Sequence, residues 1–298
     1  NYLLDASGAK IKNETFTFTM SDKPVELSAV YSIPAIAMSL PVIVEGGTIN
    51  GTQDSFVLVK AGEKVTIKAD APAENMQFHH WKVEEGTSAD FGVTVGTLGS
   101  DTEQGTEEIT FIMPRGAVKL TAHHSNKLEV SGGTAKVNGN SNADFARPGA
   151  AVTVTADSPE DYQFDHWEVS GGNIGKTEEE LKVSPLSFTM PDAAVKLNAV
   201  YKAAVKVSNG TAQTDNTTGE TVYALEGASV TVTGHDSNAS SSKLVGWKLK
   251  KGSLTAIIDA DGNSLNVTVD AEDNYLLDAS GAKIKNETFT FTMSDKPV

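Results

Sequence analysis

The chain has 298 residues, contains no cysteine and carries a formal net charge of -15 with a pI near 4.8. Without cysteine it can form neither disulfides nor thiolate metal sites. So negative a surface disfavours nucleic acid and anionic membranes as partners, because both bind clustered Lys and Arg, and no run of 18 apolar residues predicts membrane insertion.

Residues 1–33 begin the chain with a segment that recurs at the other end. Asn1–Val25 and Asn274–Val298 are identical at all 25 positions, an offset of 273 residues. One compact domain has no physical reason to keep two identical copies, so the match indicates tandem repetition. We therefore expect residues 1–33 to be the closing hairpin of a preceding repeat domain, and the sequence to be one period plus an overlap from a longer array.

Three motifs recur in order along residues 40–298 and mark shorter units. The first is a Gly followed by an alternating run, as in residues 149–156. The second is an aromatic strand that ends in Trp, and the third is a hairpin that opens with Phe-x-Met. Their spacing predicts three unequal domains at 40–125, 126–202 and 203–298, the last without its final strand.

The residues inside these motifs predict strands. In Val195–Tyr201 every second side chain is apolar, which places one face of a strand on a core and the other in water. The Thr residues of 151–156 fit the same pattern, because a β-branched polar side chain suits the solvated face of a sheet. We therefore expect an all-β chain: an extended tandem array of three small β-sandwich or β-grasp-like repeat domains.

The second domain resembles a known family. Its motifs are Gly132-Gly-Thr-Ala135, Pro148-Gly-Ala-Ala-Val-Thr-Val-Thr-Ala156, Phe164-Asp-His-Trp167 and Phe188-Thr-Met-Pro191, followed by Val195-Lys-Leu-Asn-Ala-Val-Tyr201. This string is similar to the divergent internalin-type B-repeat domains of bacterial cell-surface proteins. The resemblance implies exported, cell-wall-associated stalk modules without catalytic residues. The first domain departs from it with His124 in place of the closing Tyr, and the third lacks the Pro after Met293.

Large side chains at fixed places in each repeat are expected to build cores. Each unit needs one large apolar anchor, so we interpret the tryptophans as core residues and not as a sugar-stacking platform. The residues predicted to have a structural role are Trp81, Trp167, Trp247, Met113, Met190, Met293, Tyr31 and Tyr201.

Two patterns invite a metal-site interpretation. Adjacent strand residues point to opposite faces of a sheet, so neither His79-His80 nor His123-His124 is expected to chelate an ion. Asp259, Asp261 and Asn263 resemble the start of a calcium loop, but the bidentate Glu that ends such a loop is missing. A plain hairpin turn is therefore favoured over calcium. With no catalytic triad order or phosphate-binding glycine loop either, we expect no cofactor and no enzyme activity.

Identical tandem copies are typical of a protein whose function depends on its length. We expect a structural stalk or filament segment of an extracellular bacterial protein, which gives length and adhesion. Its expected partners are further copies of itself, in the same array or in neighbouring molecules.

Two alternatives stay open. In the first, the domains are multivalent adhesin modules that bind a host glycan or protein. In the second, the chain is a filament subunit whose free hairpin completes the third domain of a neighbouring molecule by strand addition. The candidate side chains for strand addition are Phe16, Phe18, Val25, Leu27, Ala29 and Tyr31.

Overall fold

The structure is a computed structural model that describes residues 3, 11, 15–20, 22–27, 39–86, 92–101, 103–141, 143–215, 217–235 and 243–298. The chain divides into two compact units, Asn1–Met38 and Ser39–Val298. Two candidates for strand addition, Ala29 and Tyr31, lie outside the described residues.

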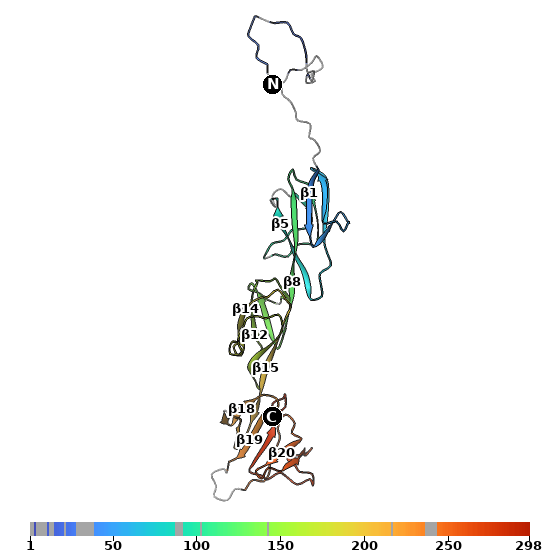
Figure 1. Cartoon of the computed structure of the whole chain (residues 1–298). Helices are drawn as coiled ribbons and strands as arrows, with labels where there is room; N and C mark the ends of the chain where they lie inside the picture. Colours follow the sequence, from blue (N-terminus) through green and yellow to red (C-terminus); the bar gives the residue numbers. More distant parts are fainter. Residues whose placement is uncertain are drawn as a thin grey trace. The chain divides into compact units, whose positions relative to one another are not determined.

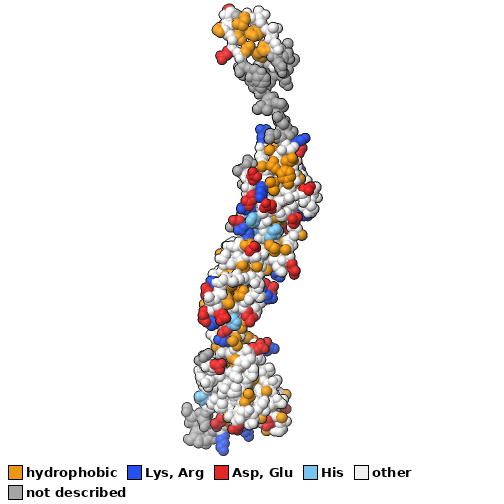
Figure 2. Space-filling model, viewed as in Figure 1, with side chains coloured by type: hydrophobic (Ala, Val, Ile, Leu, Met, Phe, Trp, Pro, Cys, Tyr) orange, Lys and Arg blue, Asp and Glu red, His pale blue; other side chains and the backbone are white. Residues whose placement is uncertain are grey.

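The first unit exposes its described apolar side chains. Phe16, Phe18, Met20, Val25 and Leu27 are all exposed, and Figure 2 shows hydrophobic side chains gathered on the surface of this unit. The ring centroids of Phe16 and Phe18 lie 6.1 Å apart. Folded domains bury most side chains of this kind, so the exposure leaves an apolar surface that can make contacts.

The second unit contains three separate hydrophobic clusters. The first cluster lies on an antiparallel sheet with the strand order β2–β4–β7–β6. A second set of strands, in the order β3–β1–β8–β5, also contributes to it. In this second set β1 and β8 run parallel (Figure 1). The strands are β1 (Ser39–Glu45), β2 (Gly47–Ile49), β3 (Phe56–Lys60), β4 (Lys64–Ala69), β5 (Met76–Glu85), β6 (Val93–Val95), β7 (Glu108–Ile112) and β8 (Val118–Ser131).

The second cluster repeats this plan. An antiparallel sheet in the order β10–β9–β12–β14 accompanies β8, β15 and β13, and here β8 and β15 run parallel while β13 and β15 run antiparallel. The elements are β9 (Gly133–Val137), β10 (Asn140–Ser141), β11 (Phe145–Ala146), β12 (Ala151–Ala156), β13 (Tyr162–Gly171), the 3-10 helix η1 (Glu180–Lys182), β14 (Leu186–Thr189) and β15 (Val195–Lys206).

The third cluster has a larger sheet in the order β17–β16–β19–β24–β20–β21, a separate pair β22–β23, and β18 paired with the end of β15. The strands are β16 (Gly210–Gln213), β17 (Thr218–Gly219), β18 (Thr221–Ala224), β19 (Ser229–Gly234), β20 (Ala256–Asp259), β21 (Ser264–Asn266), β22 (Thr268–Val269), β23 (Leu276–Leu277) and β24 (Thr288–Thr292). The predicted all-β fold of tandem domains is thus confirmed.

β8 and β15 are each one unbroken strand that serves two clusters. β8 contributes Leu120 to the first cluster and Leu128 to the second. β15 contributes Leu197 to the second cluster and Val205 to the third. The domain boundaries expected after residues 125 and 202 therefore fall inside strands, and these two joints contain no linker.

The alternation seen in the sequence accounts for the strands. In β15, the side chains of Val195, Leu197 and Ala199 are buried, while those of Lys196 and Asn198 between them are exposed. Within the described residues η1 is the one helical element, and no helix there is long and apolar enough to cross a membrane.

One predicted strand is not formed. The aromatic segments of the first two domains are β5 and β13, but residues 243–250 form no strand and make only a bridge between Lys248 and Tyr275. β5 and β13 are strands because each pairs along its length with the closing strand of its own domain, β8 or β15. Residues 243–250 border a cleft instead.

Candidate functional site

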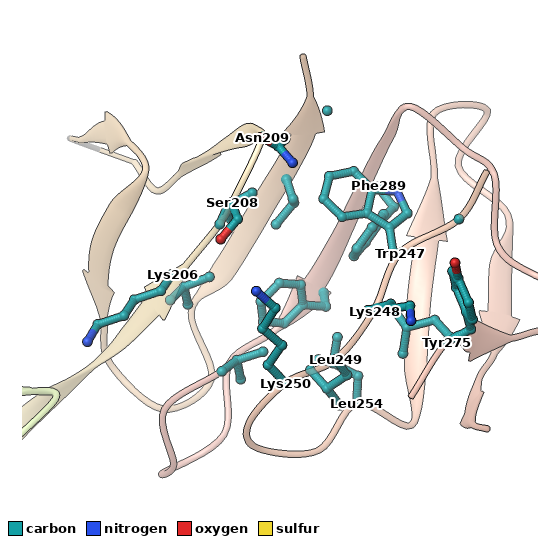
Figure 3. Close-up of a pocket in the computed structure, with 18 of the residues that line it drawn as sticks. Lys206, Ser208, Asn209, Trp247, Lys248, Leu249, Lys250, Leu254, Tyr275 and Phe289 are labelled. Atoms are coloured by element: carbon teal, nitrogen blue, oxygen red, sulfur yellow. The ribbon is translucent and has the colours of Figure 1, made fainter. Parts of the chain in front are cut away.

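A cleft of about 800 Å³ opens in the third cluster. One wall is formed by the end of β15 and the residues that follow it, 204–209, and the other by residues 243–251. Figure 3 shows Lys206, Ser208 and Asn209 on one side and Trp247 and Lys248 on the other. The cleft therefore lies between two backbone segments that do not pair with each other.

The floor of the cleft is apolar. It includes Phe289 and Phe291 of β24 together with Leu254 and Leu276, all of which are buried. Trp247 meets Phe289 edge to face, with ring centroids 5.3 Å apart, and its indole N–H donates to the Asn286 carbonyl at 2.9 Å. This floor can accept apolar side chains from a segment that enters the cleft.

The rim of the cleft is basic although the chain as a whole is strongly acidic. Lys206 and Lys251 face each other across one end, and both bond to the Asp161 carboxylate. These two hydrogen bonds hold the pKa of Asp161 below its usual value, and the bond from Lys206 contributes most. Lys243, Lys248 and Lys250 also line the cleft. The local charge thus favours an acidic ligand.

At one end of the cleft, Val298 makes two backbone hydrogen bonds with the end of β15. The Val298 N–H donates to the Ala204 carbonyl at 2.9 Å, and the Lys206 N–H donates to the Val298 carbonyl at 2.9 Å. This pattern pairs Val298 with Val205 in parallel register.

The same register opens the parallel ladder of the other two domains. Val118 of β8 pairs with Val42 of β1, and Val195 of β15 pairs with Leu128 of β8. The pairing partner of each valine lies on the first strand of its domain and stands five positions before a glycine. These glycines are Gly47, Gly133 and Gly210. Val118, Val195 and Val298 are therefore equivalent positions.

In the first two domains the chain after this valine fills the place that corresponds to the cleft. β15 runs on from Val195 between β8 and β13, where Leu197 faces Val130 on one side and Val169 on the other. β8 lies in the same way between β1 and β5. The cleft of the third domain thus corresponds to the position of a closing strand.

Comparison with known families supports this equivalence of domains. The pattern of the divergent InlB B-repeat domain matches residues 42–128 and again residues 126–205, which together span more than half of the 298 residues. The chain belongs to the divergent InlB B-repeat family. B-repeats are modules of bacterial surface proteins and are typically non-catalytic. No curated protein and no solved structure matched the chain.

The tryptophans of the two matched B-repeats are buried. Trp81 is 1% exposed and Trp167 is 0% exposed, and each belongs to the hydrophobic cluster of its own domain. Trp247 is half-buried and packs against the third cluster. The indole rings of different domains therefore share no common interior.

The methionines and Tyr201, which the sequence also predicts to have a structural role, belong to these clusters or pack against them. Met113, Met190 and Met293 are buried, one in each cluster. The Tyr201 hydroxyl donates to the backbone carbonyl of Gly132 and lies 3.1 Å from that of Asp157. It thereby ties the closing strand of the second B-repeat to its first turn.

The His79–His80 pair requires a correction of its expected geometry. β5 has a bulge between Phe78 and His80, so consecutive side chains no longer alternate, and the Nδ1 atoms of His79 and His80 lie 3.0 Å apart. The expectation that they point to opposite faces was wrong. The His123 ring centroid lies 5.0 Å from that of His80. Burial, followed by the charge of His123, lowers the pKa of His80 to about 4.

In the turn Asp259–Asn263, hydrogen bonds from within the turn satisfy the Asp259 carboxylate. Asp259 Oδ1 accepts hydrogen bonds from the N–H groups of Asp261 and Asn263, and Asp259 Oδ2 accepts one from the Asn263 side chain at 3.1 Å. The hydrogen bond from the Asn263 backbone N–H contributes most to lowering the pKa of Asp259. Within the described residues, no three His, Asp or Glu side chains are grouped to hold a metal ion.

The sequence prediction missed the basic rim and its partner Asp161. A signal was present, because the residue after the equivalent valine is a lysine in the first two domains and pairs with a glutamate. Lys119 pairs with Glu45, and Lys196 pairs with Glu129, at 2.6 Å in both cases. This charge pattern could have located the rim of the third domain.

Proposed function

We propose that the chain is a load-bearing stalk segment of a bacterial surface protein, in which tandem B-repeats provide length outside the cell. The observation that supports this best is the continuity of β8 and β15, each of which belongs to two successive domains. Neighbouring domains then share a strand, so bending a joint has to break backbone hydrogen bonds.

Polar contacts reinforce the first joint. Asn126 of β8 is buried and pairs with Met76 of β5 and with Ala146 of β11. Its side-chain amide donates to the Pro191 carbonyl at 3.4 Å. Because the backbone of one residue is held by strands of two domains, rotation about this joint is opposed from both sides.

An ion pair between domains adds to this joint. The Arg147 guanidinium of the second domain lies 2.6 Å from Asp101 of the first. The second joint has the corresponding feature in Asp161, whose carboxylate binds Lys206 and Lys251, and in Tyr162, whose hydroxyl donates to the Asp295 carbonyl at 3.2 Å. Such contacts fix the angle between neighbours more than they add stability.

An insertion at the joint tests the proposal. Four residues, Gly-Gly-Ser-Gly, placed between Ser125 and Asn126 would separate the two halves of β8. We expect small-angle X-ray scattering from the full chain to show a broader distribution of interatomic distances than the wild type, because the domains would then rotate freely. The matched control places the same four residues between Gly175 and Lys176, a site exposed at Gly175, and should leave the distribution unchanged.

Equal scattering from the joint insertion and the wild type would contradict the stalk proposal. It would mean that the shared strand does not hold neighbouring domains at a fixed angle. Circular dichroism of both insertion variants would check that each keeps its β-structure.

A further inference from the structure

We infer that the edge strand β3 of the first domain is a self-association site, and that its partner is β3 of a second copy of this chain in an antiparallel, two-fold pair. This inference goes beyond the stalk proposal, because it concerns contact between separate chains and rests on residues that the stalk proposal does not use. Within the described part of the chain, β3 pairs with β1 and with no other strand.

One side of β3 bonds to β1, and the other side is open. The Val44 N–H donates to the Ser55 carbonyl at 2.9 Å. Bonded and non-bonded pairs alternate along an antiparallel ladder, so Val57 also bonds to β1. By the same alternation, Phe56 and Leu58 direct their backbone N–H and C=O groups away from β1.

The turn after β3 uses the outward groups of Lys60. The Lys60 N–H donates to the Glu63 carboxylate at 3.2 Å, and the Lys60 carbonyl accepts the Glu63 N–H at 3.1 Å. Among the described residues, the outward groups of Phe56 and Leu58 have no such partner. A sheet edge with unpaired backbone groups is a template for a further strand.

The side chains along this edge are apolar although they face water. Phe56 and Leu58 are 53% and 60% exposed. On the neighbouring strand β1, the half-buried Ile43 stands opposite Phe56, and the half-buried Pro41 stands opposite Leu58. The buried Val42 between them points into the core, so the four other side chains form an apolar strip on the outer face of the sheet.

The third domain has polar residues at the equivalent positions. Its strand β18 corresponds to β3, because both pair antiparallel with the first strand of their domain. In that register Thr221 takes the place of Phe56. Lys206 takes the place of Ile43 on the neighbouring strand. Thr221 and Lys206 are exposed although the second domain precedes them, so an apolar strip at this position favours contact with another chain.

β3 is complementary to itself when two copies run antiparallel. With a two-fold axis at Val57, Phe56 of one copy faces Leu58 of the other, and Leu58 faces Phe56. Each of these pairs exchanges both of its N–H···O bonds, so every open group of the edge gains a partner. A shift that sets Phe56 opposite Phe56 would move Leu58 past the end of the facing strand. The axis at Val57 is therefore the favoured register.

Charge supports the same register. Asp54 and Lys60 stand at opposite ends of the edge, and both are exposed. The two-fold pair brings Asp54 of one copy to the end where Lys60 of the other copy lies, and it does so at both ends of the contact. Opposite charges in facing positions stabilise paired strands, and like charges destabilise them. The edge thus attracts a second copy locally, although the chain as a whole carries a charge of -15.

Sedimentation equilibrium of the full chain tests the inference. A standard interface buries about 1,600 Å², and one short strand pair buries less, so we expect a weak dimer and measure at concentrations up to about 1 mM. No larger species should form, because a two-fold contact is closed. Leu58→Asp should weaken the dimer by about tenfold or more, since the change occurs twice in the contact and faces Phe56 each time.

The matched control is Val95→Asp. Val95 is 61% exposed on β6, which is an edge strand of the other sheet of the same domain. This variant adds the same charge to an exposed apolar position and should dimerise like the wild type. Circular dichroism checks that both variants keep their β-structure.

An exchange of charges tests the register without changing an apolar residue. Asp54→Lys alone and Lys60→Asp alone should each weaken the dimer by about fivefold, because like charges then face each other at both ends. A mixture of the two single variants should form heterodimers more tightly than either variant pairs with itself. The double variant should recover the affinity of the wild type.

Hydrogen exchange locates the contact. As the concentration rises, the amides of Phe56 and Leu58 should become protected. The amide of Val57 bonds to β1 within one chain, so its protection should not depend on concentration.

Several results would overturn the inference. These are a Leu58→Asp variant that dimerises like the wild type, a Val95→Asp variant that loses the dimer, a mixture of charge variants that gives no heterodimer, or a dimer in which the amides of Phe56 and Leu58 stay unprotected. A wild type that is monomeric at every concentration would also overturn it, because the partner of the edge would then not be a second copy.

Discussion

At the scale of single residues, the packing around Trp81 and Trp167 depends on a glycine. A Cβ atom at Gly47 would lie 2.7 Å from Cη2 of Trp81 and 2.6 Å from the Lys68 carbonyl oxygen. Gly133 has the same relation to Trp167, at 2.7 Å. The Gly-Gly-Thr motif of the B-repeat is thus explained by the space that the indole ring needs.

Gly47→Ala is predicted to destabilise the first domain by about 1–3 kcal/mol, because the added methyl group overpacks the core. The control is Gly116→Ala, where a Cβ atom meets nothing within 4 Å, and there we expect a change within about 0.5 kcal/mol. Hydrogen exchange of β4, β5 and β7 amides measures both. Equal losses in the two variants would show that the contact with Trp81 is not the cause.

Buried histidines make the first domain sensitive to pH. His80 is 3% exposed, lies among His79, His123, Asp101 and Arg147, and has its pKa lowered to about 4, mainly by burial. An unfolded histidine titrates near 6.5, so the unfolded state binds more protons between these values. Stability should therefore be full above about pH 6.5 and fall as the pH decreases toward 4.

Urea unfolding of the full chain at pH 7 and pH 5 measures this loss, followed by hydrogen exchange in the first domain. His80→Gln should reduce the difference between the two pH values. If the variant and the wild type lose the same stability, protonation of His80 does not contribute.

At the scale of elements, the shared strands decide how the domains are coupled. β8 and β15 were expected as closing strands of single domains, and each instead continues into the next. A strand that closes one domain still has unpaired backbone N–H and C=O groups. The next domain needs a first strand that runs in the same direction and uses such groups. One continuous strand meets both requirements without a turn.

Leu120→Ala on β8 is predicted to show this coupling. Leu120 is fully buried in the first cluster, so its truncation should cost that domain roughly 2–5 kcal/mol. The second domain, which shares β8, should lose a smaller amount, and the third domain should lose none, as expected for nearest-neighbour coupling. Hydrogen exchange resolved by domain checks this order, and a loss in the third domain as large as in the second would contradict it.

At the scale of the whole molecule, separate cores explain how the array can be extended. The first two clusters are each complete within one domain and its shared strands, so a further domain adds length without altering these cores. The third domain differs because its cleft lies where the others hold a closing strand.

The sequence by itself determined the repeat, the strands and the tryptophan anchors, because identity between copies and alternation along a strand are local patterns. Trp81 and Trp167 could be placed in cores for this reason. Tertiary structure alone decided that the joints lie inside β8 and β15, that a bulge brings His79 to His80, and that Lys206 and Lys251 meet at Asp161. Each of these depends on which distant segment pairs with which, and alternation of residues does not specify a pairing partner.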